Sequence, residues 1–431
     1  MDAAENDLLT QVGPGTPMGG LLRRHWMPIS GASEFDENTR VKPVRLMGED
    51  LVLYKDLSGR FGLVERKCAH RRADLSYGFV EKCGLRCNYH GWAYDETGQC
   101  VEMPYEDTVA PKARYRDKIK ILAYPVREHA GMIWAYMGPL PAPELPNWEP
   151  FTWKNGFRQI IISQIPCNWL QCQENSIDPV HFEWMHTNWS RRQADIDAEL
   201  GPKHMKVGFD AFRYGLIYRR QREDLPPDHP MWSVGRVCLW PNCFFLGDHF
   251  EWRVPIDDEN TLSVAWVFQR VPTEMEPYEQ PVIPTWHGPI TDPETGRWIS
   301  THVINQDFIA WVGQGTIADR TLEKLGMSDR GILMLRRQLM DDIEAIARGE
   351  DPMGLIRDPA ENVCVELPIA ERDILVDGLP MEKMKAHPVF GKHLDRFMFQ
   401  AGQPPEVWQA FCDAMGLENR QKFDDRQVIN I

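Results

Sequence analysis

Two short segments of the sequence each pair a cysteine with a histidine, residue types that bind transition metals. One residue separates Cys68 from His70, two residues separate Cys87 from His90, and sixteen residues lie between the two pairs. Each segment can therefore present two ligands from one tight loop. Together the loops offer two thiolates and two imidazoles, which suit either a zinc ion or an iron–sulfur cluster in which two histidines replace two cysteines.

The order of the ligands separates these two kinds of site. Zinc fingers pair cysteine with cysteine and histidine with histidine, whereas each loop here contributes one of each. A Rieske [2Fe–2S] cluster needs the mixed arrangement, because one iron binds both thiolates and the other binds both imidazoles. The spacing therefore favours a Rieske cluster held by Cys68, His70, Cys87 and His90. A zinc site and a chance grouping remain the alternatives.

A second pair of histidines, His181 and His186, lies in the segment ENSIDPVHFEWMH at 174–186. On an ideal α-helix their spacing places the two side chains about 140° apart, so two ligands of one metal would need a distorted turn. Pro179 supplies a cause, because it has no backbone donor and disfavours helical geometry at Asp178. The alternative is one buried and one exposed histidine.

The elements that must position these residues fall into two groups. Short apolar segments divided by turns up to residue 138 predict a small β domain, with both Cys–His loops at hairpin ends. The proline-rich stretch 139–150 indicates a domain boundary. Beyond it, strand patterns at 158–165, 212–221 and 237–240 and a hairpin around 257–260 are followed by helical patterns at 302–315 and 330–348.

The motifs resemble those of one family. CAHRR at 68–72 and CNYHGW at 87–92 resemble the Rieske motif of aromatic-ring-hydroxylating oxygenases, and Asp178–His186 matches their D-x-x-H-x4-H signature for a mononuclear iron. VGPGTPMG near the start and the segment at 314–332 are similar to the phthalate-dioxygenase-type group. The resemblance implies an α+β fold: a lead-in at 1–24, an all-β Rieske domain at 25–140, and a catalytic domain at 150–431 with an antiparallel sheet flanked by helices, of helix-grip type.

The resemblance also implies a 2-His-1-carboxylate site that holds Fe(II) through His181, His186 and a carboxylate from elsewhere. Asp307 is the predicted third ligand, because it falls inside the apolar stripe of the helix predicted at 302–315, where an unpaired carboxylate is costly. A buried salt bridge is its alternative role, and Glu174 is the reserve ligand. Asp319 and Asp329 each stand beside an arginine and are expected to form surface pairs or caps.

Asp178 is implied as a catalytic bridge and not as a ligand. In head-to-tail trimers of the family, the equivalent aspartate links a mononuclear-iron histidine to a cluster histidine of the neighbouring subunit, and such a carboxylate would orient both rings. Its alternative role is a helix N-cap with Pro179 in the first turn.

The implied protein is the terminal oxygenase of a multicomponent system. A separate NAD(P)H-dependent reductase, and possibly a ferredoxin, would supply electrons, and an aromatic carboxylate would be hydroxylated or O-demethylated with O2. Two rivals stay open: an electron carrier that uses only the Rieske cluster, and a zinc-stabilised binding module. Arg213, Arg219 and Arg253 lie on predicted strands, but exposed ion pairs are their commoner explanation.

The net charge and the distribution of apolar residues limit which partners and which cellular compartment are expected. A formal charge of −15 over 431 residues argues against nucleic acid as a partner, since phosphate binding needs a basic face. The acidic N-terminus shows no signal peptide, and no apolar run approaches the roughly 18 residues of a membrane span. These features predict a cytoplasmic protein without a membrane partner.

Overall fold

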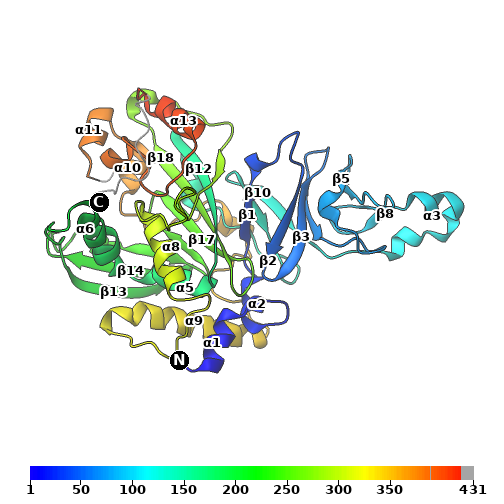
Figure 1. Ribbon diagram of the computed structural model, residues 1–431, viewed down its shortest axis with the longest axis horizontal. Helices are drawn as coiled ribbons and strands as arrows, with labels where there is room; N and C mark the ends of the chain where they lie inside the picture. The colour runs from blue at the N-terminus through cyan, green and yellow to red at the C-terminus, as the bar shows by residue number, and fades with distance from the viewer. Residues whose placement is uncertain (389, 419–431) are drawn as a thin grey trace.

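The computed structural model describes residues 1–388 and 390–418, so the end of the predicted second domain, at 419–431, lies outside the described residues. A β-rich part, which includes α3 at its far end, extends to one side of a larger part that is built around a single sheet (Figure 1). No helix in the described ranges has the length and apolar character needed to cross a membrane.

The β-rich part consists of three small antiparallel sheets. One has the order β1-β11-β10, the second β2-β3-β4-β9 and the third β5-β6-β7-β8. Their strands are β1 (Met27–Gly31), β2 (Val41–Leu46), β3 (Glu49–Lys55), β4 (Phe61–Glu65), β5 (Phe79–Val80), β6 (Leu85–Arg86), β7 (Ala93–Tyr94), β8 (Cys100–Glu102), β9 (Ala123–Tyr124), β10 (Val126–His129) and β11 (Met132–Ala135).

The two Cys–His loops lie where two of these sheets meet. Cys87 and His90 occupy the connection between β6 and β7, and Cys68 and His70 follow β4. A separate core beneath the loops includes Val52, Leu75, Leu85 and Tyr94, all of them almost fully buried. This core holds the loop ends rigidly, while the loop tips face the surface.

The larger part is organised by an eight-stranded sheet with the order β13-β14-β15-β16-β17-β18-β12-β19. Every pairing is antiparallel except β12 with β19. Its strands are β12 (Gly156–Ile165), β13 (His204–Phe212), β14 (Gly215–Arg222), β15 (Arg236–Leu239), β16 (Cys243–Phe245), β17 (His249–Pro255), β18 (Thr261–Arg270) and β19 (Thr285–His287).

Central strands of this sheet are buried on both faces. Along β12, Ile160 and Ile162 belong to one apolar cluster, while Ile161 belongs to the other. Side chains of a strand alternate between faces, so the sheet is covered on both sides. This is the predicted α+β architecture, and the antiparallel sheet with flanking helices is confirmed.

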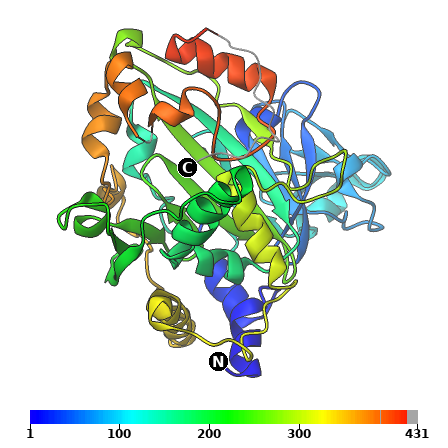
Figure 2. The ribbon, with the colours of Figure 1, turned by 60° about the vertical axis from the view of Figure 1, so that its left-hand side comes forward.

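Three helical elements carry the residues of the predicted iron site. They are α5 (Trp169–Ile177), a π-helix η5 (Phe182–Trp189) and α8 (Val303–Gly313). The α5 helix contacts β14, β15, β16 and β17, and α8 contacts both α5 and η5. In Figures 1 and 2, α5 and α8 lie side by side against the sheet. The helix predicted at 330–348 is α9 (Arg330–Ala347), with Leu335 and Leu339 fully buried.

The first 24 residues, predicted only as a lead-in, form α1 (Ala3–Thr10) and α2 (Pro17–Leu22). Asp2 and Glu5 form a capping box at the start of α1, and Thr16 caps α2 with Pro17 in its first turn. Both helices contact α9, and α1 also contacts α5 (Figure 2). The start of the chain therefore packs on the helices of the larger part.

The remaining α-helices are short. They are α3 (Pro104–Val109), α4 (Glu149–Thr152), α6 (Ser190–Ala194), α7 (Pro230–Ser233), α10 (Arg372–Asp377), α11 (Met381–Ala386), α12 (Phe390–His393) and α13 (Pro405–Met415). Residues 139–147, within the predicted boundary, form neither helix nor strand.

Candidate active site

The two Cys–His loops present their four side chains in two layers. The Cys68 and Cys87 side chains are almost fully buried, whereas His70 is half-buried and His90 is exposed. The two imidazole rings lie 4.4 Å apart between centroids, and His70 stacks on Trp92. Tight backbone bonds from Arg72 to Cys68 and from Gly91 to Cys87 close the two loops.

This arrangement fits two irons better than one zinc ion. A Rieske cluster binds thiolates on one side and imidazoles on the other, which matches buried thiols beneath outward imidazoles. The Nδ1 atom of His70 is buried without a hydrogen-bond partner. Among the described residues, the three-residue group whose ligand atoms lie within 4.8 Å of one another is found elsewhere, at His181, His186 and Asp307. A single tetrahedral zinc ion would need the ligand atoms of the four loop side chains to lie as close together as those of His181, His186 and Asp307.

The π-helix explains how His181 and His186 share one side of the backbone. A π-helix closes hydrogen bonds between residues five apart, so the five-residue spacing that separates side chains on an α-helix brings them together here. The ring centroids lie 5.1 Å apart. The sequence predicts a distorted turn at this place, and the π-helix begins at Phe182, three residues after Pro179. Asp178 ends α5, and its Oδ1 accepts a bond of 2.7 Å from the Val180 amide.

Asp307 reaches the same point from α8. Its Oδ1 lies 3.7 Å from Nε2 of His181 and 3.4 Å from Nε2 of His186, and its side chain is only 8% exposed. Among the described residues, these two imidazoles are its only ion-pair partners, so the alternative of a salt bridge to lysine or arginine is not seen. Asn175 of α5 donates to the same oxygen at 3.3 Å. Two imidazoles and one buried carboxylate form the donor set of a non-haem iron site.

His186 is held from behind by Gln306. Its Nδ1 lies 3.0 Å from Oε1 of Gln306, which leaves Nε2 directed at Asp307. The Nε2 of Gln306 in turn donates to Ser190 at 2.8 Å and to the Ser300 carbonyl at 3.1 Å. Burial lowers the pKa of His186, but the Asp307 carboxylate outweighs it and the net direction is upward. A fixed amide of this kind orients a ligand ring, and no motif in the sequence marks Gln306 for this role.

Glu174, the reserve ligand, is excluded by its partners. It is buried and receives hydrogen bonds from Arg320 at 2.8 to 3.1 Å and from Arg336 at 2.6 Å. Although burial opposes it, Arg320 and Arg336 lower the pKa of Glu174. Arg320 is buried against Glu174 and does not pair with Asp319. Asp319 instead accepts hydrogen bonds from the Thr321 amide and hydroxyl, which is the capping alternative of the prediction.

Asp178 lies beside the iron site but does not enter it. Its Oδ2 is 3.7 Å from Nδ1 of His181, and that Nδ1 is buried without a hydrogen-bond partner. The Asp178 side chain is 27% exposed, so it also faces outward. Because it terminates α5 and does not begin the next helix, the N-cap alternative is not what the structure shows.

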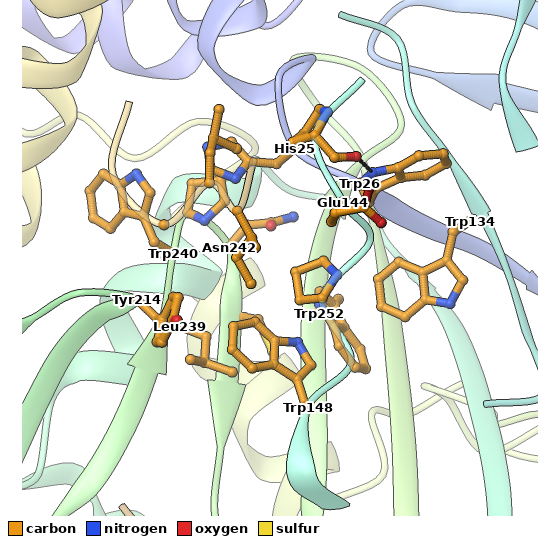
Figure 3. A pocket seen from close by; sticks show the side chains of 17 residues that line it. His25, Trp26, Trp134, Glu144, Trp148, Tyr214, Leu239, Trp240, Asn242 and Trp252 are labelled. Carbon is orange, nitrogen blue, oxygen red and sulfur yellow. Dashed lines mark hydrogen bonds between the residues drawn. The ribbon is translucent and has the colours of Figure 1, made fainter. Parts of the chain in front are cut away.

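A cavity of about 520 Å³ opens next to the three residues. Its apolar wall is aromatic, and its polar wall carries Arg220 and the charged side chains of β17. The apolar lining includes Phe182, Phe244, Leu246, Val267, Phe397 and Phe399. Pockets for small molecules typically measure about 300–1,000 Å³. A second cavity, lined by His25, Trp26, Trp148 and Trp240 (Figure 3), holds only about 40 Å³. It has room for little more than water.

Arg220, in the wall of the larger cavity, is a cation that no carboxylate of residues 1–388 or 390–418 pairs with. Its residue is 7% exposed, its guanidinium stacks over the Phe182 ring at 4.3 Å, and its Nε is buried without a partner. Burial lowers the pKa of Arg220 to about 10, so the group stays charged at neutral pH. The sequence pattern pointed to the neighbouring Arg219 and not to Arg220.

The three arginines considered from the sequence are all paired. Arg213 and Arg219 form ion pairs with Glu361 and Asp210 on the outer side of the sheet. Arg253 is buried against Glu251 and stacks on Trp311. Beside it, His249 bridges Asp248 and Glu251. Burial opposes the charge of His249, but Asp248 and Glu251 raise its pKa to about 9.

Comparisons with known proteins agree with this geometry. The family model described as a Rieske [2Fe-2S] domain matches residues 25–116, and the one described as LigXa C-terminal domain like matches residues 294–371, which include Asp307. The 5,5'-dehydrodivanillate O-demethylase oxygenase subunit of Sphingobium sp. is 59% identical, over 98% of this chain and 99% of that protein.

Two further proteins are similar to this chain, one in sequence and one in structure. The phthalate 4,5-dioxygenase oxygenase subunit of Pseudomonas putida is 32% identical, over 81% of this chain and 88% of that protein. The terminal oxygenase of carbazole 1,9a-dioxygenase from Nocardioides aromaticivorans has a similar structure, with a TM-score of 0.54 at 17% identity over 81% of this chain and 97% of that one. The similarity to the carbazole dioxygenase structure supports the fold of this chain.

Proposed function

This chain belongs to the oxygenase subunits of the Rieske oxygenases, and from that premise we propose that it O-demethylates a methoxylated aromatic carboxylate. It is an enzyme, and neither rival, an electron carrier or a zinc module, accounts for relatives that are oxygenase subunits over most of their length. The cluster supplies electrons, and the mononuclear iron, when bound, activates dioxygen.

We assign the ligands from the geometry. The cluster would be held by Cys68, His70, Cys87 and His90, whose thiols are buried and whose imidazoles face outward. The mononuclear iron would be held by His181, His186 and Asp307. These are the three side chains whose ligand atoms converge within 4.8 Å in the described chain. Gln306 and Asn175 would keep His186 and Asp307 in position.

The observation that carries the substrate class is the unpaired guanidinium of Arg220 in the cavity beside these three residues. Burying a charge without a partner is costly, and no carboxylate of the described chain pairs with it. A carboxylate on the substrate would supply the missing charge and could accept two parallel hydrogen bonds. The aromatic lining would hold the ring, and the ring would place its methoxyl group toward the iron ligands.

The relative that is 59% identical is named for dehydrodivanillate, which is itself a methoxylated aromatic carboxylate. Dehydrodivanillate consists of two linked vanillate units, each a benzoate with a hydroxyl group and a methoxyl group. The volume of about 520 Å³ can admit a ligand with two rings. Oxygen insertion into the methyl group consumes one dioxygen, two electrons and two protons, and it yields a phenol, formaldehyde and water.

We further propose that the protein works as a trimer or a multiple of a trimer, supplied with electrons by a separate reductase. Within one chain, the cluster loops lie in the β-rich part, away from α5 and α8 (Figure 1). The exposed His90 could approach Asp178 of a second copy, and Asp178 would then join His90 to His181. This contact would carry electrons between subunits.

The experiment that tests the proposal uses the iron-loaded protein with a Rieske-oxygenase reductase and NADH. With dehydrodivanillate we expect one formaldehyde per demethylated ring, oxygen uptake in step with it, and three irons and two acid-labile sulfides per chain. A ring-dihydroxylated product without formaldehyde would refute O-demethylation. An iron content of zero with bound zinc would refute the metal assignment.

A further inference from the structure

A second polar group lines the substrate cavity and pairs with the π-helix. It is His204, the first residue of β13, which pairs with Glu183 of the π-helix. The Oε2 of Glu183 lies 2.9 Å from Nδ1 of His204 and also accepts the His204 backbone amide at 2.6 Å. The two side chains are only 6% and 10% exposed. The pair is therefore a built and buried feature of the cavity wall.

The hydrogen bond fixes which ring nitrogen of His204 carries the proton. An ionised carboxylate can only accept, so Nδ1 donates to Glu183 and Nε2 keeps its lone pair in the neutral ring. Burial lowers the pKa of His204, and the nearby Arg220 acts in the same direction. The Nε2 atom is therefore a hydrogen-bond acceptor at neutral pH.

No described residue donates to this acceptor. Nε2 of His204 is buried without a hydrogen-bond partner, and His204 lines the same cavity as His181, His186 and Arg220. In the β13–β14 ladder His204 lies opposite Arg222, two residues from Arg220. Cross-strand partners and residues two apart share a face, so His204 and Arg220 point to the same side of the sheet. A buried acceptor without a donor is costly, so a ligand that supplies the donor gains affinity.

We infer that Nε2 of His204 accepts a hydrogen bond from a hydroxyl group of the substrate, so that the cavity recognises a phenol as well as a carboxylate. The inference rests on the proposed function and deepens it. His204 would bind the phenolic hydroxyl while Arg220 binds a carboxylate, and two fixed points would set which methoxyl group approaches the iron. The ligand class is a methoxylated aromatic acid with a free phenol.

The test measures equilibrium binding to the oxidised holoenzyme without reductase, so that no turnover occurs. The two ligands are dehydrodivanillate and its derivative in which both phenolic hydroxyls are methylated. Wild type should bind the phenol about tenfold more tightly, as expected for one hydrogen bond to a buried acceptor. His204→Phe keeps a ring and removes the acceptor, so it should bind the two ligands equally. His204→Gln, which has a carbonyl acceptor, should restore part of the preference.

The matched control is Met205→Phe, the next residue on the strand, whose side chain is 65% exposed; it should keep the tenfold preference. Iron content and circular dichroism of each variant check its folding. The inference is overturned if wild type binds both ligands equally, or if His204→Phe weakens both by the same factor. If wild type binds neither ligand, the proposed substrate class fails together with the inference. Binding of both ligands with equal affinity leaves the substrate class standing.

Discussion

Two adjacent arginines on β14 show how much depends on the single residue. Arg219 pairs with Asp210 and is partly exposed, while Arg220 is buried, unpaired and stacked on Phe182. Strand alternation sends neighbouring side chains to opposite faces, so one guanidinium meets solvent and the other meets the cavity. The sequence pattern shows the strand but not which of its faces is the inner one, so it does not distinguish Arg220 from Arg219.

Arg220→Met should weaken binding of an aromatic carboxylate while leaving the iron in place. Methionine keeps the packing on Phe182 but removes a charge-assisted contact worth about 1.5–3 kcal/mol, so the dissociation constant should rise about 10- to 100-fold. The measurement is equilibrium binding of dehydrodivanillate to the holoenzyme, with iron content determined in parallel. Arg219→Met is the control and should stay within about twofold. Equal losses in the two variants would contradict the role of Arg220.

At the scale of the element, the predictions that succeeded relied on periodicity. The apolar spacing at 302–315 and 330–348 predicts α8 and α9 to within a few residues, and the turn at 257–260 predicts the β17–β18 hairpin. The π-helix was predicted only as a distortion, because spacing shows that an ideal α-helix fails but not which helix replaces it. Gln306 and the Glu183–His204 pair join distant segments, and contacts of that kind leave no local pattern.

The buried amide of Gln171 in α5 bonds to the end of α8 and to the turn that follows it. Its Nε2 donates to the carbonyls of Trp311 and Gly315 at 2.7 and 2.8 Å, and its Oε1 accepts the Ala318 amide at 2.9 Å. Gln171→Leu would remove all three hydrogen bonds and leave the buried Ala318 amide without a partner, so we expect a loss of about 2–4 kcal/mol in the free energy of unfolding. Urea denaturation of the holoenzyme measures it.

The control for this prediction is Gln314→Leu, near the end of the same α8 helix. Gln314 donates only to the Ala310 carbonyl at an exposed position, so its replacement should change the free energy of unfolding by less than about 0.5 kcal/mol. Similar small losses in both variants would show that Gln171 does not hold the two helices together.

At the scale of the whole molecule, the two metal sites must communicate between subunits if the proposed trimer is correct. Asp178→Asn should leave cluster and iron content unchanged, because asparagine can still accept the Val180 amide and no metal ligand is altered. Turnover should fall at least 100-fold, since the bridge between two imidazoles loses its charge. Stopped-flow reoxidation of the reduced cluster with substrate and O2 measures the step. Reoxidation at the wild-type rate would refute the bridge.

The junction between the two parts contains a carboxylate that titrates outside its usual range. Glu34, just after β1, accepts hydrogen bonds from Lys42 and from His287 of β19. Although burial opposes it, His287 and Lys42 lower the pKa of Glu34 to about 2. The ionised form therefore stabilises the folded state fully above the unfolded pKa of about 4.5, and this stabilisation is lost as the pH falls toward 2.

Comparison of Glu34→Gln with wild type tests this titration. At pH 7 the variant should be less stable to urea by about 3 kcal/mol, the value of the pKa change, and the difference should shrink steadily between pH 5 and pH 3. Asp36→Asn is the control: Asp36 lies two residues away at the surface, with bonds only to local amides. A difference between Glu34→Gln and wild type that is independent of pH would contradict the assignment.

The first two helices pack against the larger part: α1 contacts α5 and α9, and α2 contacts α9. A fragment beginning at residue 150 would expose the surface that Leu9, Val12, Leu21 and Leu22 now cover. A fragment ending before residue 150 would carry those leucines with nothing to cover them. Separate expression of the two halves should therefore yield aggregating pieces, whereas a circular permutation that joins the first 24 residues to the larger half would respect the physical boundary.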